Sequence, residues 1–298
     1  MKIVSLLPSA TEIVFALGLG DALEAVTFEC DYPEAARTKP VVSTTALTGD
    51  QLSAAEIDEQ VSTRLAQGEP IYRLDAARIS LIAPDLILSQ DLCQVCAVPT
   101  GEVERALDVL GCRAEVISLD PSTLDEVIAC VGLVGAATGE SARATALMTQ
   151  LRDRIAAVRA AVAGRDRPRT LALEWSDPPF SGGHWVPDMI DAAGGDPLLA
   201  ETGSPSRRLR WEEIADAAPD VVVFMPCGYG LEAAADEGAD LLTEPSLAGA
   251  GIVCAANGDA YFSRPGPRVV TGVEALASLL HPDAVPPPVP GVIRLLRP

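Results

Sequence analysis

The chain has 298 residues, of which 48% are hydrophobic and 21% are charged, so it holds enough apolar material for packed cores and is not disordered as a whole. Its length suggests two domains of ordinary size. The 42 acidic residues outnumber the 22 Lys and Arg and give a formal net charge of -20. Because such a surface repels phosphate groups, we expect no nucleic-acid partner. No apolar run reaches the roughly 20 residues of a membrane-spanning helix, so we expect no membrane insertion.

The start of the chain predicts a strand that turns directly into a helix. The apolar run Lys2–Leu7 is followed by Pro8, Ser9, Thr11 and Glu12, which do not fit a signal peptide. Ser9 and Glu12 have the spacing of a capping box, so we expect Ser9 to cap the helix and Glu12 to complete the box. This interpretation predicts a cytoplasmic location, and a periplasmic or lipid-anchored one if a leader was removed. Seven cysteines, an odd number, then favour thiols or metal ligands over a disulfide framework.

Strand and helix patterns alternate along the rest of the chain, which is typical of α/β folds with parallel sheets. The elements expected in the first half are strand 22–28, helix 76–83, strand 85–89, helix 102–110, strand 114–119 and helix 123–136. The last of these opens with a second capping-box pattern, Thr123 to Glu126. The polar region 45–75 predicts an inserted helical or loop segment. The elements expected in the second half are strands 170–174, 221–225 and 260–262, helix 187–193 and a helix that begins at Trp211.

Two segments of the chain are alike. Residues 79–88 and 214–223 each combine the end of a helix, a Pro-Asp turn and a buried strand. The strand and helix that begin at residue 2 have a coarser counterpart that begins at residue 170. A repeat of this length indicates two similarly built lobes and not a solenoid.

The longest helical pattern, 139–163, lies between the repeated halves. Its apolar positions fall on one face at steps of three and four: Leu147, Leu151, Ile155, Val158 and Val162. About 25 residues make a rod of roughly 37 Å, long enough to join two lobes, although one oversized crossover helix remains an alternative. We therefore predict an α/β fold of two Rossmann-like lobes with parallel sheets, joined by one long rigid α-helix. The expected parts are the N-terminal lobe 1–136, the linker helix 137–164, the C-terminal lobe 165–281 and the Pro-rich tail 282–298, extended on the surface.

The loops that leave the carboxyl ends of parallel strands form the ligand crevice, so they supply the candidate ligand-binding residues. These are Ser9, Glu29, Cys30, Tyr32, Gln90, Cys93, Trp175, His184, Trp185, Cys227, Tyr229, Phe262 and Arg264. The five aromatic residues among them could form a flat wall for a large planar ligand, or simply pack. Arg264 is a suitable donor to a carboxamide, carboxylate or phosphate. We expect no catalytic residues.

Thiols and an imidazole suggest a metal site as a second possibility. Cys93 and Cys96 have a spacing used in zinc sites, but no second pair follows them. With His184 they are the candidate ligands of zinc or another soft metal, and Cys30 and Cys227 could add thiolates. His184, next to Gly183 and Trp185, could equally donate a hydrogen bond to an organic ligand. The remaining cysteines are interpreted as buried apolar residues: Cys112, Cys130 and Cys254.

Residues 2–12, Lys-Ile-Val-Ser-Leu-Leu-Pro-Ser-Ala-Thr-Glu, resemble the opening of the mature cobalamin-binding and iron-siderophore-binding proteins of ABC importers. The supporting segments follow in order: 31–33, 42–44, 84–88, 186–195, 211–213 and 264–268. The likeness covers nearly the whole chain and is closest to the cobalamin-binding branch, in particular a subgroup with Glu-Cys-Asp-Tyr-Pro at 29–33 and the Cys93 and Cys96 pair. That family has two α/β lobes joined by one long helix.

The resemblance implies a corrinoid ligand, such as cobalamin, between the lobes. It also implies docking to an ABC permease through a glutamate on each lobe. Glu212 stands near the second-lobe position, whereas Ala77 occupies the first-lobe position. Glu29 and Thr45 stand about where aromatic residues flank cobalamin in the transport proteins, so we expect this chain to hold its ligand with other residues.

The function expected from the sequence is therefore non-catalytic binding of a corrinoid in the cleft between two lobes. One alternative is a cysteine-rich soft-metal-binding protein or a metal-dependent enzyme that uses the cleft thiolates. A further alternative is binding of a ferric siderophore or haem. The acidic composition disfavours it, because anionic chelates usually need several cations.

Overall fold

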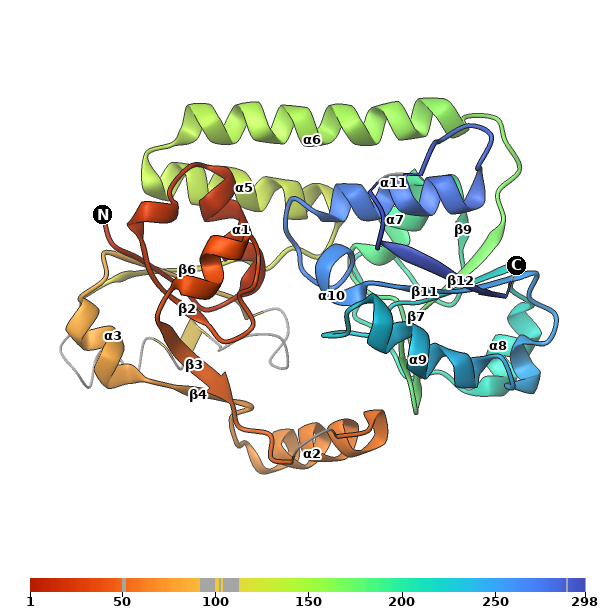
Figure 1. The fold of residues 1–298 in the computed structure, drawn as a ribbon, viewed down its shortest axis with the longest axis horizontal. Helices are drawn as coiled ribbons and strands as arrows, with labels where there is room; N and C mark the ends of the chain where they lie inside the picture. Colours follow the sequence, from red (N-terminus) through yellow and green to blue (C-terminus); the bar gives the residue numbers. More distant parts are fainter. Residues whose placement is uncertain (50–51, 92–99, 102, 104–112, 288, 298) are drawn as a thin grey trace. The chain divides into compact units, whose positions relative to one another are not determined.

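The computed structural model describes residues 1–49, 52–91, 100–101, 103, 113–287 and 289–297 (Figure 1). The chain divides into two compact units, one of Met1–Asp120 with Ala129–Leu147 and one of Pro121–Ile128 with Met148–Pro298. Each unit contains one β-sheet, and the predicted α/β class with parallel-stranded sheets is confirmed. Helices α5 (Leu124–Thr138) and α6 (Ser141–Val162) contribute residues to both units.

The first unit is built on a six-stranded sheet in the order β4-β3-β2-β1-β5-β6. Its parallel strands are β1 (Ile3–Ser5), β2 (Leu23–Thr27), β3 (Val41–Thr45), β5 (Leu86–Ser89) and β6 (Glu115–Ser118). The edge strand β4 (Tyr72–Leu74) runs antiparallel to β3. The helices are α1 (Pro8–Ala16), α2 (Ala54–Gln67) and α3 (Ala76–Ile82), with 3-10 turns η1 (Gly20–Ala22) and η2 (Glu34–Thr38). Buried aliphatic residues of neighbouring strands, such as Val4, Ala25 and Ile87, form the core.

The second unit contains the sheet β12-β11-β10-β7-β8, with β9 paired to β7. Its strands are β7 (Arg169–Ser176), β8 (Pro179–Ser181), β9 (Asp196–Pro197), β10 (Val221–Phe224), β11 (Ile252–Ala256) and β12 (Ile293–Arg297). Its helices are α7 (Val186–Ala192), α8 (Trp211–Ala217), α9 (Leu231–Leu241), α10 (Gly258–Tyr261) and α11 (Val269–Leu280), with the 3-10 turn η3 (Pro245–Leu247). Strands β9, β7, β10 and β11 are parallel, and β8 and β12 are antiparallel to their neighbours.

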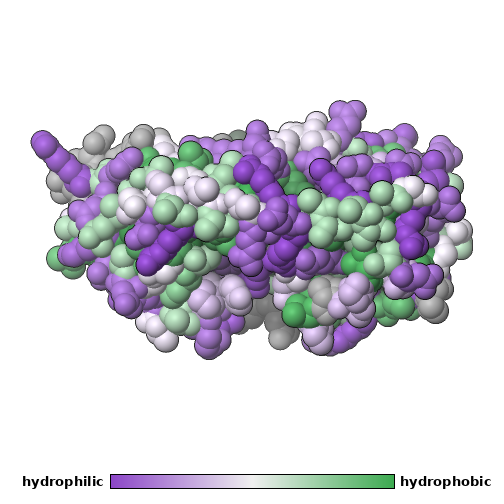
Figure 2. Space-filling model, turned by 90° about the horizontal axis from the view of Figure 1, so that it is seen from above, coloured by the Kyte–Doolittle hydropathy of each residue, from purple (hydrophilic) through white to green (hydrophobic). Residues whose placement is uncertain are grey.

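The predicted long helix is present as α6, whose 22 residues span roughly 33 Å. Four positions of the predicted apolar stripe, Leu151, Ile155, Val158 and Val162, are buried. In the second unit, Arg154 of α6 donates hydrogen bonds to Glu274 of α11 at 2.9 and 2.7 Å. Strongly hydrophilic residues are interspersed with apolar ones over the face that Figure 2 shows. Among the described residues, no helix is both long and apolar enough to cross a membrane.

The internal repeat predicted from the sequence is reproduced in the hydrogen bonds of both units. The carboxylate of Asp85 accepts the backbone N–H of Lys2 at 2.7 Å, and the carboxylate of Asp220 accepts the backbone N–H of Arg169 at 2.8 Å. In each case the carboxylate satisfies a donor at the start of the neighbouring parallel strand, which helps to set the register between β5 and β1 and between β10 and β7.

The helices that precede these aspartates also end alike. Ala83 and Ala218 lie in the left-handed region, with φ of 49° and 41°, and each stops its helix two residues before the aspartate. Lys2 and Arg169 donate their side-chain N–H groups to the last carbonyl of α3 and of α8, at 2.8 and 2.7 Å. A cation at a helix C-terminus is favourable, so the Pro-Asp segment is one structural unit used twice.

We expect Asp220→Ala to lower the free energy of unfolding by about 1 kcal/mol, because the N–H of Arg169 loses its acceptor. Chemical denaturation measures this, with Asp216→Ala as a control that removes the same charge from the exposed surface of α8. The control should stay within about 0.5 kcal/mol of the parent chain. Equal effects of the two substitutions would show that the contact does not stabilise the fold.

One predicted capping box is wrong and the other is confirmed. Helix α1 begins at Pro8 with Leu7 as its N-cap and no side-chain cap, so Ser9 and Glu12 lie inside the helix. The reason is that proline, which has no N–H to satisfy and a fixed φ, favours the first helical position. At α5 the backbone N–H of Glu126 donates to Thr123 Oγ1 at 3.3 Å, and the N–H of Thr123 donates to the Glu126 carboxylate at 3.1 Å.

Several strands differ from the prediction. Residues 260–262 are not a strand: Ala260 and Tyr261 belong to α10, which Asn257 caps through a bond from the N–H of Ala260, and the buried strand is β11. The region 45–75 contains both α2 and the unpredicted β4, and the Pro-rich tail ends in β12. Almost all of the predicted helix 102–110 lies outside the described residues.

Candidate functional site

The carboxyl edge of the first sheet is lined by small buried polar side chains. Ser43 donates to Thr27 Oγ1 at 2.7 Å, and Thr11 Oγ1 lies 3.0 Å from Cys30 Sγ. Among the predicted site residues, Ser9, Cys30 and Gln90 are buried here, and the Gln90 amide donates to the Leu119 carbonyl at 3.1 Å. Each of these three side chains is 5% exposed or less, so they stabilise the edge of the sheet and offer little surface to a ligand.

Aromatic side chains are exposed at the same edge. Tyr32, predicted from the sequence, is 48% exposed, and Phe28 is 43% exposed. The Phe28 ring lies 6.4 Å from the ring of Tyr72, centroid to centroid. Phe28 and Tyr72 were missed from the sequence because residue 28 was assigned to a strand and β4 was not predicted. Glu29, between these aromatic residues in sequence, is half-buried.

In the second unit, Trp175 at the end of β7 packs edge-on against Tyr229, with ring centroids 5.7 Å apart. Both residues are half-buried, and both were predicted site residues. Trp185 and Phe262 differ from the predicted flat wall. They are 6% and 1% exposed, and the indole Nε1 of Trp185 donates to the Phe262 carbonyl at 2.7 Å, so both form part of the core.

His184 is held in an unusual backbone conformation. Its φ is 52°, in the left-handed region that residues other than glycine rarely adopt. The N–H of His184 donates to the Ser204 carbonyl at 2.7 Å, and its carbonyl accepts the N–H of Gly203 at 3.0 Å. Burial lowers the pKa of the half-buried imidazole, so the ring is neutral at pH 7 and can offer a lone pair. Strain that the surroundings enforce in this way is typical of functional sites.

Glu174, which the sequence reasoning missed, fastens the His184 loop to the sheet. Its carboxylate accepts the backbone N–H of Gly183 at 3.0 Å and the hydroxyl of Ser206. Burial raises the pKa of Glu174, although both hydrogen bonds oppose the shift. The signal in the sequence was weak, because Glu174 precedes Trp175 within a strand and its partners lie up to 32 residues away.

A second carboxylate accompanies the aromatic pair. Glu237 of α9 accepts the hydroxyl of Ser176, and the phenol of Tyr229 is hydrogen-bonded to it as well. Burial together with the Glu237 charge raises the pKa of Tyr229 to about 12. Tyr229 is therefore a neutral phenol at any physiological pH.

The remaining predicted residues have less to offer a ligand. Arg264 is 9% exposed and donates to Asp259 at 2.7 Å, so its charge is already balanced. Cys227 is exposed on the turn after β10. Cys93 and Cys96 lie outside the described residues. Within the part of the chain that the structure describes, no three His, Cys, Asp or Glu side chains gather to hold a metal ion.

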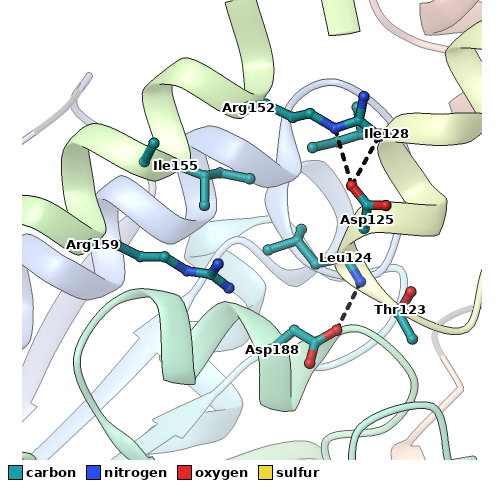
Figure 3. A pocket seen from close by; sticks show the side chains of 9 residues that line it. Thr123, Leu124, Asp125, Ile128, Arg152, Ile155, Arg159 and Asp188 are labelled. Atoms are coloured by element: carbon teal, nitrogen blue, oxygen red, sulfur yellow. Dashed lines mark hydrogen bonds and ion pairs between the residues drawn. The ribbon is translucent and has the colours of Figure 1, made fainter. Parts of the chain in front are cut away.

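An open cavity of about 370 Å³ lies in the second unit where the first turn of α5 meets α6 and α7 (Figure 3). Two pairs of its polar groups bind one another: Arg152 donates to Asp125 at 3.1 and 2.9 Å, and the N–H of Leu124 donates to Asp188 at 2.9 Å. Arg159 points into it (Figure 3). None of the predicted site residues lines this cavity.

A family model, described as periplasmic binding protein, matches residues 3–250. The chain belongs to the periplasmic binding protein family. The suspected resemblance is thereby confirmed, and the fold agrees with it. The family name gives no support to the predicted cytoplasmic location.

Similar proteins are described as binding one of two ligands, vitamin B12 or haem. A vitamin B12-binding protein of Yersinia pestis is 25% identical over 292 residues, which cover 97% of this chain and 88% of that protein. The periplasmic vitamin B12-binding protein BtuF of Vibrio cholerae has a TM-score of 0.66 at 25% identity and covers 94% of this chain and 96% of its own. The periplasmic haem-binding protein RhuT of Roseiflexus has a TM-score of 0.67 at 25% identity and covers 95% and 98%.

Proposed function

We propose that this protein binds a corrinoid such as cobalamin at the carboxyl edges of its sheets and catalyses no reaction. The observation that carries the proposal is the His184 loop. It precedes α7, which leads to the parallel strand β9, so it lies on the carboxyl side of the second sheet. Two hydrogen bonds hold the backbone of His184 in the left-handed conformation, and burial favours its neutral imidazole. A neutral imidazole is a suitable ligand for a cobalt ion or a hydrogen-bond partner of a corrin side chain.

Aromatic surfaces support a large, flat ligand. The first unit presents the exposed ring of Phe28, which packs near the buried Tyr72, and the second presents the half-buried pair Trp175 and Tyr229. Such rings offer wide apolar contact to a macrocycle, and Tyr32 adds a further exposed ring to the first unit.

The charges at these edges favour a ligand whose periphery is neutral. In the second unit, the carboxylate of Glu237 lies beside Tyr229 of the aromatic pair, and the guanidinium of Arg264 is balanced by Asp259. The amide side groups of a corrin tolerate this setting, whereas the carboxylates of haem and the charge of a ferric siderophore would be repelled. The B12-binding relatives agree with this preference.

Haem is the second candidate, because the haem-binding relative is as similar to this chain as the B12-binding one. His184 is also a side chain that can bind haem iron. In the second unit, the charge of Arg264 is already paired with Asp259, which places haem behind a corrinoid in our proposal. The metal set of Cys93, Cys96 and His184 gains no support from the described residues, since two of its three members lie outside them.

We further propose that the protein delivers its ligand to an ABC permease, as a periplasmic or lipid-anchored partner. Glu212 is exposed at the start of α8, where a permease arginine could reach it. The repeat places Ala77 at the equivalent position of α3, also exposed. Docking through this chain would therefore rely on the second unit more than on the first.

Titration with cyanocobalamin and with haemin tests the proposed ligand class. We expect cyanocobalamin to raise the midpoint of thermal unfolding, because a ligand at 100 times its Kd adds about 2.7 kcal/mol to the stability. Haemin should stabilise the protein less at equal concentration. Stabilisation by haemin alone would replace the corrinoid proposal with haem binding, and the absence of both effects would reject the proposed function.

A further inference from the structure

The internal repeat reveals a segment that only the first unit has. Strands β1 and β5 and helix α3 correspond to β7, β10 and α8, and β2 pairs with β1 as β9 pairs with β7. Between β9 and α8 the chain needs only residues 198–210, whereas between β2 and α3 it needs residues 28–75. The difference contains α2 with its connections to β3 and β4. We call residues 46–49 and 52–71 the α2 arm.

The α2 arm stands at the carboxyl edge of the first sheet. Strand β3 is parallel to β2, so the arm leaves at that edge, and β4 is antiparallel to β3, so the arm returns to it. Figure 1 shows α2 beyond the ends of β3 and β4, apart from α1 and α3. Phe28 directly follows β2, and Tyr72 is the first residue of β4. Their ring contact therefore lies where the arm joins the sheet.

Contacts within the arm hold it in place. The side-chain amide of Gln60 accepts the N–H of Thr48 at 3.0 Å and donates to the Thr48 carbonyl at 2.8 Å. Ser53 and Glu56 form a capping box at the start of α2. Val61 packs on the core of the first unit. The arm is thus an ordered part of this edge, stabilised by its own hydrogen bonds and by packing on the core.

The arm carries negative charge. Helix α2 has three acidic residues, Glu56, Asp58 and Glu59, and its one cation, Arg64, forms an ion pair with Glu69 at 3.1 Å. Hydrogen bonds from Ser53 hold the pKa of Glu56 below its usual value, so this carboxylate stays ionised. Counted over its described residues, the arm therefore brings a net negative charge to the edge where ligand would bind.

We propose that the α2 arm forms one wall of the ligand site and selects against ligands with an anionic periphery. The inference rests on the proposed function and deepens it, since it names the segment that decides between an amide-bearing and a carboxylate-bearing macrocycle. At about 10 Å in water, one pair of unit charges changes an affinity by roughly twofold, so several acidic groups together discriminate strongly.

Charge reversal on the arm tests this selection. We expect Asp58→Lys with Glu59→Lys to raise the affinity for haemin about tenfold at low ionic strength, with cyanocobalamin affinity unchanged within about twofold. The gain should shrink at high salt. The matched control is Asp21→Lys with Glu24→Lys, which makes the same change of net charge on exposed residues at the opposite end of β2. Equal gains in the arm variant and the control would overturn the inference, because net charge alone would then explain them.

Removal of the arm is the second test. Ala46 and Ile71 already face each other, with the N–H of Ala46 donating to the Ile71 carbonyl at 2.7 Å. Replacing residues 47–70 by Asn-Gly joins them in a two-residue β-hairpin. We expect at least about fivefold weaker binding of cyanocobalamin and loss of the preference over haemin.

The outcomes separate the two proposals. Unchanged binding of both ligands by the hairpin variant overturns the role of the arm and leaves the proposed function standing. Failure of the parent chain to bind either ligand rejects the proposed function itself. If the hairpin variant does not fold, the comparison of the charge-reversed arm variant with its control is sufficient to test the role of the arm.

Discussion

Replacing His184 by glycine should weaken ligand binding at least tenfold while leaving the fold at least as stable. Glycine adopts a φ of 52° without strain, so the substitution relieves a backbone cost of about 1 kcal/mol. It deletes the imidazole but keeps the two backbone hydrogen bonds to residues 203 and 204. We expect the affinity for aquocobalamin to fall at least tenfold, which is about 1.4 kcal/mol, and thermal unfolding to stay unchanged or shift upward.

The pH dependence of the same binding gives an independent readout. Because burial lowers the pKa of His184 below its usual value near 6.5, the imidazole stays neutral down to acidic pH. Binding should therefore be flat around neutral pH and weaken only well below pH 6.5, where the ring gains a proton. The stability of the fold depends on pH in the same direction. The unfolded chain takes up the His184 proton at a higher pH than the folded chain does, so the contribution of this group to stability is complete above pH 6.5 and is lost as the pH falls. A glycine variant that binds as tightly as the parent chain, with the same spectrum, would remove His184 from the site.

The order of the elements was readable from the sequence because it depends on local patterns. Apolar runs such as 86–88 and 221–223 have the composition of buried parallel strands, and the pattern of α6 repeats with the helical period. The Pro-Asp repeat was equally visible, since its turn, helix end and strand follow one another within ten residues. The hydrogen bonds from Lys2 to Asp85 and from Arg169 to Asp220 are part of this repeated unit.

The missed elements depend on contacts between distant residues. Strands β4 and β9 have three and two residues, and β12 exists because it pairs with β11 across about forty residues of chain. Too few side chains lie in such strands to show a period of two. The start of α1 was misplaced for a local reason, because Pro8 outweighs the Ser9 signal.

The residues of the candidate site follow in part from the order of the strands, whereas their burial and geometry do not. Counting the loops after each strand selected Trp175, Tyr229 and His184, because the topology of parallel sheets brings those loops to one edge. The same reasoning selected Trp185 and Phe262, which are core residues. The place of a residue in the order of strands and loops does not show whether its side chain is buried. The left-handed conformation of His184 depends on Gly203 and Ser204, some twenty residues later, and no short pattern encodes that contact.

Glu174 should matter to the fold more than any other polar residue near His184. Replacing it by alanine leaves the N–H of Gly183 and the hydroxyl of Ser206 without their acceptor in a largely buried setting. We expect Glu174→Ala to lower the free energy of unfolding by about 2–3 kcal/mol and to weaken ligand binding, because the His184 loop loses its tie to β7. Chemical denaturation and ligand titration measure the two effects.

Glu174→Gln separates the shape of this side chain from its charge. Glutamine keeps an oxygen that can accept the Gly183 N–H, and it carries no charge to desolvate. Since burial raises the pKa of Glu174, the group contributes stability below the unfolded pKa, and that contribution is lost as the pH rises through the folded value. The parent chain should therefore lose stability relative to Glu174→Gln as the pH rises from acid to neutral. At pH 7 the glutamine variant should be within about 1 kcal/mol of the parent chain and should bind ligand normally. Parallel pH profiles for the two proteins would show that Glu174 is not strained by its burial, and the tie to the His184 loop would then have to be explained by its hydrogen bonds alone.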